Sequence, residues 1–332
     1  MDFAPLPWHT TWLAKARALT SEHHHAWLVV GRTGDGVGHA ASALAASLLC
    51  HQPKASVACG QCPSCRWLAG DVHPDFRKLE PDVGDDLKVK LPTIKVDDVR
   101  DALDFMHLTP AGEEGRVLLV DPAEALERVS ANAILKALEE PPPNTRWLLV
   151  AAQPERLLPT IRSRALKIAV PGPTQAEALA WLRAQGVSLP ETLLQQSRGE
   201  PLSALAASQS ESGSAREEFV RDLLRPGQLP TLKWGAWVEA GPKAERRERF
   251  AALLRALLDW TSDWARVRTQ LAPRVFVAER TGLSALGPGL PLSEALRYHR
   301  ALLRKLNLPD TTLSARLQFE SLLLDYRALF SR

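Results

Sequence analysis

The sequence lacks long apolar runs, and neither sign of charge is in large excess. None of its 332 residues lie in an apolar run near the roughly 20 residues that span a bilayer, which argues against a membrane protein. The chain carries 41 basic and 38 acidic residues, a net charge of +3, so charge alone gives no argument for nucleic-acid binding. The first residues, MDFAPLPWHTTW, lack the basic and then apolar order of a secretory signal. The sequence therefore predicts a cytoplasmic protein with no membrane segment.

Cysteine is absent from the whole chain except for one stretch of sixteen residues. Its four cysteines are Cys50, Cys59, Cys62 and Cys65. Two CxxC steps share Cys62, and Cys50 can close a set of four thiolates from the end of a preceding helix. Two disulfides or four free thiols are the alternatives, but disulfides need an oxidising compartment. The spacing predicts a structural Zn²⁺ with four protein ligands and no open position for chemistry.

Short apolar runs recur along the first half of the chain and are typical of buried strands. Between them lie stretches with apolar residues at helical spacing, of which 39–50, 96–108 and 130–140 are the clearest. The expected strands are 26–30, 76–79, 117–120, 147–151 and 166–170. Strands alternate with helices, and the central strands are apolar throughout, which predicts an α/β fold with a parallel sheet covered on both faces.

No strand pattern follows the Pro171-Gly172-Pro173 segment. Three short helices are expected within 174–207, a polar linker at 208–214, and helices from there to the end. The long segment 243–271 carries basic and apolar residues at helical period, which favours a bundle helix with a solvated basic face over a DNA-binding stripe.

The first strand leads into a glycine-rich turn and a helix, which is the setting of a phosphate-binding P-loop. The residues of this degenerate loop are Gly31, Gly34, Gly36, Val37 and Gly38, with Asp35 among them. Val37 and Gly38 stand where a lysine would neutralise phosphate charge and a hydroxyl would hold Mg²⁺. Asp35 adds a negative charge where phosphate would sit. The sequence therefore predicts that this loop does not hydrolyse ATP. The alternative to a degenerate phosphate loop is a glycine turn with a structural role only.

A second metal-binding motif is also incomplete. Asp121 follows the expected strand 117–120, at the place of a carboxylate linked to Mg²⁺. An ATPase of this class usually carries a catalytic glutamate next, but this chain has Pro122, and Glu124 lies further along. We therefore interpret Asp121 as a residue that caps the end of the strand.

Four stretches carry a resemblance to a known family. They are the strand and degenerate loop at 28–38, the cysteine module with the GDVHPD that follows it at 50–75, SANAILKALEEPP at 130–142, and PERLLPTIRSR at 154–164. In this order they resemble the delta-prime subunits of the bacterial DNA polymerase III clamp loader, which are AAA+ proteins. The helical remainder of the chain fits this family by architecture only.

The resemblance implies a fold and a division into three domains. An α/β RecA-like AAA+ domain with a parallel sheet would span 1–170 and carry the zinc module at 50–65. A small helical lid domain would span 171–210, and an all-α C-terminal collar domain would span 211–332.

The resemblance also implies roles for two residues. Arg164 would act as an arginine finger, reaching across a subunit boundary to a neighbour's ATP, although the family's usual Ser-Arg-Cys is here Ser163-Arg164-Ala165. The alternative is a surface arginine paired with an acidic neighbour such as Glu155. Leu202 occupies the position of a phosphate-sensing arginine in ATP-binding paralogues, so another phosphate contact is missing.

The leading hypothesis is thus a non-catalytic clamp-loader subunit. Its partners would be the delta and gamma/tau subunits, and through the complex the sliding clamp and primed DNA. An active AAA+ ATPase of the gamma/tau type is the alternative, opposed by the degenerate loop. A third hypothesis is a nucleic-acid-binding zinc module, in which Arg66 and Trp67 would touch nucleic acid, but few basic residues surround the cysteines.

Overall fold

The computed structural model describes residues 3–20, 24–81, 93–209, 212–287, 289–306 and 314–330. The chain folds into two compact units. Of the described residues, the first unit contains those up to Trp181 together with Glu200–Leu202, and the second contains Leu182–Gly199 and those from Ser203 onward.

The first unit is built on a sheet of five strands in the order β2-β3-β4-β1-β5. All neighbouring strands pair in parallel, and Ala26 and Val30 of β1 lie opposite Trp147 and Ala151 of β4. The strands are β1 Ala26–Val30, β2 Phe76–Leu79, β3 Arg116–Val120, β4 Thr145–Ala151 and β5 Leu166–Ala169. The central strands β1, β3 and β4 lie on apolar runs, whereas the edge strands β2 and β5 each include basic residues. All five expected strands are confirmed.

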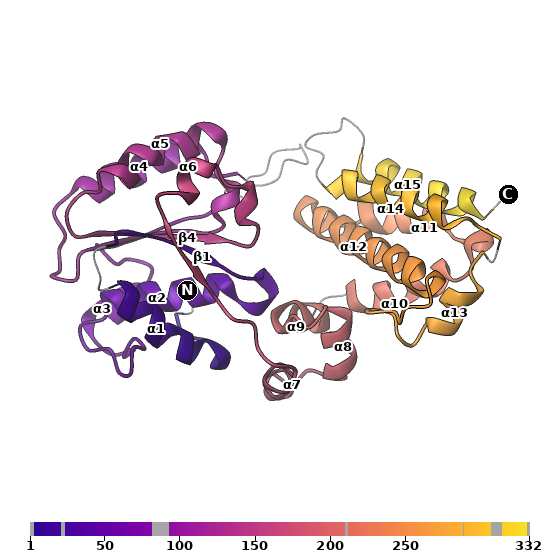
Figure 1. Ribbon diagram of the computed structural model, residues 1–332, viewed down its shortest axis with the longest axis horizontal. Coiled ribbons are helices and arrows are strands. Elements are labelled where there is room, and N and C mark those ends of the chain that lie inside the picture. The colour runs from indigo at the N-terminus through magenta and orange to yellow at the C-terminus, as the bar shows by residue number, and fades with distance from the viewer. Residues whose placement is uncertain are drawn as a thin grey trace. The chain divides into compact units, whose positions relative to one another are not determined.

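Helices cover both faces of this sheet (Figure 1). One face carries α1 (Thr10–Thr20), α2 (Val37–Leu49) and α3 (Pro63–Ala69). The other carries α4 (Val96–His107), α5 (Arg128–Glu139) and α6 (Pro159–Arg162).

The sheet has an apolar core on each face, and side chains that alternate along each strand contribute to both cores. Trp27 and Val29 pack with α1 and α2, whereas Leu28, between them, packs with α4, α5 and α6. Side chains of successive strand residues point to opposite faces, so a sheet buried on both faces needs apolar residues at every position. This confirms the α/β class predicted from the sequence.

The second unit is helical throughout its described residues. Its buried side chains include several large aromatics: Phe219, Trp234, Trp260, Trp264, Phe319 and Tyr326. Trp260 donates a hydrogen bond from Nε1 to the Tyr326 hydroxyl at 2.9 Å, and that hydroxyl donates to the Leu223 carbonyl at 3.0 Å. The polar atoms of these rings are therefore satisfied inside the core.

The remaining helices lie after the sheet, and α7 is divided between the units. They are α7 Gln175–Ala184, α8 Pro190–Gln196, α9 Pro201–Gln209, α10 Ser212–Leu223, α11 Thr231–Glu239, α12 Lys243–Arg268, α13 Arg280–Ala285, α14 Leu292–Leu306 and α15 Ala315–Leu329. Short 3₁₀ turns occur at Pro7–His9, Thr33–Asp35, Ala123–Ala125, Pro154–Arg156 and Pro226–Gln228.

One local expectation was wrong. The expected linker at 208–214 is partly helical, because Ser208 and Gln209 end α9 and α10 begins at Ser212. The residues on either side of the expected boundary at 210/211 lie outside the described parts of the chain. The PERLLPTIRSR segment folds as the turn Pro154–Arg156 followed by α6.

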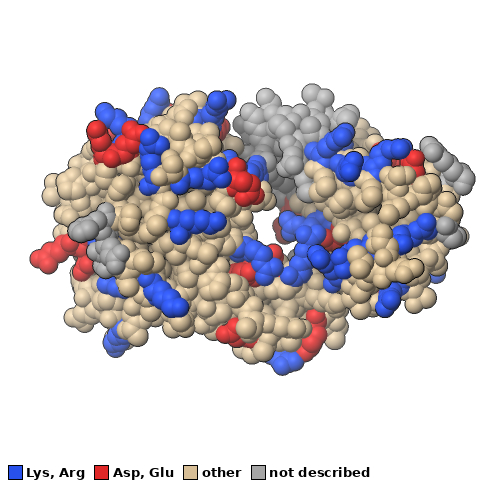
Figure 2. Space-filling model, viewed as in Figure 1, with Lys and Arg blue, Asp and Glu red and all other residues tan. Residues whose placement is uncertain are grey.

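Charged side chains are spread over the face drawn in Figure 2, and on this face the basic ones are more prominent than the acidic ones. Among the described helices, none is both long and apolar enough to cross a membrane.

Candidate functional site

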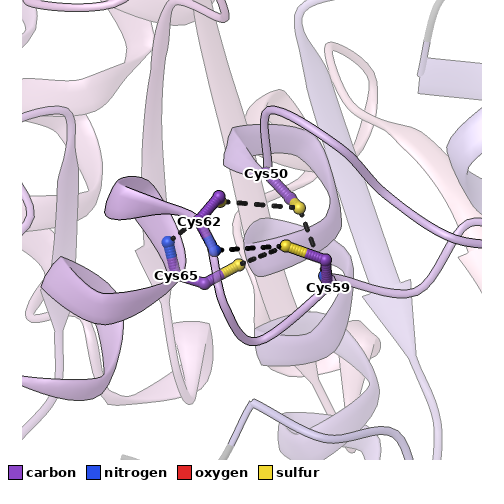
Figure 3. A group of neighbouring side chains, drawn as sticks. All are labelled: Cys50, Cys59, Cys62 and Cys65. Carbon is purple, nitrogen blue, oxygen red and sulfur yellow. Dashed lines mark hydrogen bonds between the residues drawn. The ribbon is translucent and has the colours of Figure 1, made fainter.

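The four cysteines converge at the end of α2 and the beginning of α3 (Figure 3). Cys50 follows Leu49, the last residue of α2, and adopts an extended backbone conformation. Cys62 is the N-cap of α3 and its Sγ accepts a hydrogen bond from the Cys65 backbone N–H, so Cys65 lies in the first turn of that helix. The ends of the two helices thus position three of the cysteines, and Cys59 comes from the loop between them.

The distances between the sulfur atoms fit a tetrahedral metal site. Sγ of Cys50 lies 3.9 Å from that of Cys62, Sγ of Cys59 lies 3.9 Å from that of Cys65, and all four atoms lie within 4.8 Å of one another. Zinc bound to four thiolates at about 2.3 Å places the sulfurs about 3.8 Å apart. A disulfide would need about 2.05 Å, and all four cysteines are free. The residues could therefore hold a metal ion, and the donor set is compatible with zinc.

The protein environment alone does not keep all four thiols ionised. Burial raises the pKa of Cys65 to about 12, whereas backbone N–H donors, chiefly that of Gln61, lower the pKa of Cys59 to about 6. Two backbone N–H groups lie close to these sulfurs: the N–H of Cys62 donates to Cys59 Sγ at 3.4 Å, and the N–H of Cys59 donates to Cys50 Sγ at 3.2 Å. A bound cation would supply the charge that lets the buried thiols ionise as well.

The glycine-rich loop contains an ion pair between two of its own residues, Arg32 and Asp35. Asp35 is buried, and its carboxylate accepts hydrogen bonds from Arg32 Nε at 2.7 Å and Arg32 Nη2 at 3.0 Å. Burial raises the pKa of Asp35, and the hydrogen bonds from Arg32 oppose that shift. A Cβ on Gly172 would lie 2.5 Å from Asp35 Oδ2, so this carboxylate packs directly against the Pro171-Gly172-Pro173 segment.

Side chains from distant parts of the chain cover the loop. Trp8 donates a hydrogen bond from Nε1 to the Asp35 carbonyl at 3.0 Å. Gly36 has φ of +87°, and three side chains lie within 3.3 Å of the place that a Cβ on it would take: Leu6, His9 and Leu202. A nucleotide bound against Gly36 would have to displace these side chains. The resemblance pointed to Leu202, but Trp8 and His9 were missed because nothing local links them to the loop.

His9 is fully buried beside the loop, and neither ring nitrogen has a hydrogen-bond partner in the described structure. Burial, assisted by the nearby charge of His39, lowers the pKa of His9 to about 4. The ring is therefore neutral at pH 7 and acts as packing against the loop.

Gly38 and Asp121 meet at the carboxyl end of the sheet. A Cβ on Gly38 would lie 2.6 Å from Asp121 Oδ2, so the place of the missing hydroxyl side chain is taken by this carboxylate. Burial raises the pKa of Asp121, and Lys78 opposes the shift. Glu124 instead binds the backbone of another segment: its Oε1 accepts a hydrogen bond from the Gln153 N–H at 2.5 Å.

Arg164 lies just after α6, and its guanidinium is half-exposed. Nη1 donates to the Thr160 carbonyl at 2.9 Å, and Nη2 contacts the Glu139 carboxylate. The acidic partner in the structure is thus Glu139 and not Glu155. The sequence missed this pair because the two residues are 25 positions apart, Glu139 at the end of α5 and Arg164 just after α6.

Comparisons with known proteins identify relatives of this chain among the subunits of DNA polymerase III. Residues 11–173 match the family described as DNA polymerase III, delta subunit. The delta-prime subunit of DNA polymerase III from Pseudomonas aeruginosa is 39% identical over 248 residues, which cover 74% of this chain and 71% of the relative. The delta-prime subunit from Escherichia coli K12 is 32% identical over 239 residues, 71% of this chain and 69% of the relative.

Relatives of a second type match a shorter stretch. The DNA polymerase III gamma subunit of Buchnera aphidicola (subspecies Schizaphis graminum) is 36% identical over 143 residues, 43% of this chain and 37% of that protein. Among solved structures, a gamma subunit-related protein from Thermotoga maritima covers 95% of this chain and 98% of its own, at 18% identity and a TM-score of 0.44, which is too low to add support. The longer matches decide the assignment: the chain belongs to the delta-prime subunit family of DNA polymerase III.

Proposed function

We propose that this chain is a subunit of the DNA polymerase III clamp loader that does not hydrolyse ATP at its own glycine loop and instead supplies Arg164 to the ATP site of a neighbouring subunit. The proposal rests on one observation: the protein's own side chains occupy the glycine-rich loop. Asp35 and Arg32 neutralise each other there, and the carboxylate of Asp121 occupies the place of a hydroxyl side chain on Gly38.

The chemistry of phosphoryl transfer supports the loss of activity. Catalysis of this reaction comes almost entirely from positioning and from neutralising charge on the phosphates. Val37 offers no charge, Gly38 offers no oxygen for Mg²⁺, and Pro122 replaces the expected glutamate. The same three residues argue against an active ATPase of the gamma/tau type, even though gamma subunits are among the relatives.

A subunit without its own ATPase can still take part in hydrolysis. An arginine finger in trans stabilises the charge that develops on the γ-phosphate in the transition state. We propose that the partners are the delta and gamma/tau subunits and, through the assembled complex, the sliding clamp and primed DNA. Bacterial DNA replication takes place in the cytoplasm, so we place the protein there.

The cysteine module completes the proposal. We infer that Cys50, Cys59, Cys62 and Cys65 hold a structural Zn²⁺, because four protein thiolates leave no open coordination position. The ion would fix the start of α3 to the end of α2 and supply the charge that the buried thiolates need. It would have no part in the reaction at the neighbouring ATP site.

Reconstitution tests the proposal. The chain should co-purify with delta and gamma/tau subunits, and by itself it should hydrolyse no ATP. Arg164→Ala in the assembled complex should lower ATP hydrolysis stimulated by clamp and DNA, and Arg164→Lys should rescue poorly because lysine lacks the planar fork. Arg162→Ala, on the same turn and exposed, is the matched control and should match wild type. An Arg164→Ala complex that assembles and hydrolyses ATP at the wild-type rate would refute the role of Arg164.

A further inference from the structure

The backbone that carries Arg164 is fixed on both sides. Ile161, in α6, is fully buried, and the backbone N–H of Arg164 donates to its carbonyl at 3.1 Å. Ala165, which follows Arg164, packs against the same core, and β5 begins at Leu166. The backbone position of Arg164 is therefore set by the core, and only its long side chain remains to be oriented.

The side chain is oriented by contacts to two helices. Nη1 donates to the Thr160 carbonyl and lies 3.4 Å from Ser163 Oγ, both within its own turn. Nη2 contacts Glu139, the last residue of α5, and this is the contact that ties the guanidinium to another element.

Glu139 is as well anchored as Arg164. Leu138, next to it, is buried in the core between α5 and the sheet, and α5 packs against α6. Pro141, Pro142 and Pro143 end the helix directly beyond it. The carboxylate is exposed, but it projects from a rigid base toward one particular arginine.

The pair is suited to orienting the guanidinium and not to sequestering it. Both side chains are partly exposed, with relative accessibilities of 32% for Arg164 and 50% for Glu139, and exposed ion pairs are weak. The contacts to Thr160, Ser163 and Glu139 use at most three of the five N–H donors of the guanidinium. Donors remain for an anion, and the weak pair can be kept or exchanged when that anion arrives.

We propose that Glu139 is a positioning residue for Arg164, which holds the guanidinium in a restricted set of rotamers before a neighbouring subunit's phosphates reach it. The inference rests on the proposed role of Arg164 in trans. An arginine side chain has many rotamers, and restricting them in advance reduces the entropy lost when the guanidinium contacts the transition state. Removing Glu139 should therefore slow hydrolysis without weakening ATP binding, since the neighbour binds ATP with its own residues.

The test uses the reconstituted complex with wild-type delta and gamma/tau subunits. The Arg164-dependent part of the stimulated ATPase rate is the difference between the wild-type and Arg164→Ala complexes. Glu139→Ala should reduce this part by roughly two- to fivefold, the range expected from one exposed ion pair, with KM for ATP unchanged. Glu139→Gln, which keeps an acceptor oxygen but loses the charge, should fall between Glu139→Ala and wild type. Glu140→Ala is the matched control, since it removes the neighbouring exposed glutamate, and should match wild type.

A double variant separates the two ideas. If Glu139 acts through Arg164, then Glu139→Ala added to Arg164→Ala should cause no further loss. A further loss, a Glu139→Ala complex with the wild-type rate, or a rise in KM with unchanged kcat would overturn the positioning role while the role of Arg164 stands. A wild-type rate for Arg164→Ala itself would refute both. Gel filtration of each complex checks assembly, and loss of assembly in both Glu139 variants would assign the residue a structural role instead.

Discussion

Val37 and Gly38 replace the two residues that a phosphate loop uses for chemistry, and each now has a packing role. Val37 is buried, with 3% of its surface exposed, and it lies 3.2 Å from the place of a Cβ on Gly31. Gly38 leaves room for the Asp121 carboxylate. The changes therefore do more than remove functional groups, because neighbouring side chains have taken the space.

Restoring the lysine should not restore activity. Val37→Lys would bring an ammonium into a buried apolar position, which should lower the free energy of unfolding by about 1–3 kcal/mol. The variant should still hydrolyse no ATP, because Gly38 and Pro122 provide neither the hydroxyl nor the carboxylate. Phosphate release by the isolated variant, together with urea unfolding, measures both effects. Turnover above that of the wild-type chain, abolished by a second change at Gly36, would contradict the proposal.

Protonation of His9 should destabilise the fold at mildly acidic pH. Burial lowers its pKa from 6.5 to about 4, so between these values the unfolded chain binds a proton that the folded chain does not. The contribution of neutral His9 is complete above pH 6.5 and is lost as the pH falls toward 4, by about 3 kcal/mol in total. Urea unfolding between pH 7 and 4 should show a steeper loss for wild type than for His9→Phe. Equal slopes would contradict this, and His107→Phe, at an exposed site, controls for general titration.

Among elements, the sequence predicted best those that are set by local composition. The central strands β1, β3 and β4 lie on apolar runs, and α2, α4 and α5 show helical spacing, so these elements could be predicted directly. The sequence did not predict the helix α3, because it is only seven residues long and contains Pro63 and Cys65. Two contacts could not be predicted from the sequence, because their residues meet only in the folded chain. Trp8 and Asp35 of the glycine loop are 27 positions apart, and Glu139 and Arg164 are 25 positions apart.

The cysteine module joins α2 and α3, so loss of one cysteine should affect both helices. Zinc analysis of wild-type protein should give about one ion per chain, and Cys62→Ala should lose it. Cys62→Ser should also lose zinc, but it keeps an oxygen that can cap α3, so it should be about 1 kcal/mol more stable than Cys62→Ala. Metal stoichiometry and thermal unfolding measure these effects. A ratio near zero in wild type prepared without chelators would exclude the site.

For the molecule as a whole, the three-domain division expected from the sequence stays a prediction. The two compact units divide the residues of the proposed lid, 171–210, in a different way: Leu182–Gly199 belongs with the C-terminal helices and Glu200–Leu202 with the sheet. Within the second unit, Arg198 pairs with Asp259 of α12, and Arg216 of α10 donates to Gln196 Oε1 at 3.0 Å. These interactions tie α8 to the helices that form the C-terminal core.

The pair between Arg198 and Asp259 should be the stronger of these ties. Asp259 is buried, with 3% of its side chain exposed, so removing its cation leaves a carboxylate with poor access to water. Arg198→Ala should therefore lower the free energy of unfolding by about 1–3 kcal/mol. The loss should not be larger, because the Arg198 side chain is itself exposed and water already screens the pair. Urea unfolding measures the loss, and faster hydrogen exchange at α8 amides would localise it. Arg183→Ala, which removes an exposed pair with Glu191, should change stability by less than about 0.5 kcal/mol. Equal effects of the two variants would mean that the buried carboxylate finds water or another donor, and that α8 is held to the C-terminal helices by apolar packing instead.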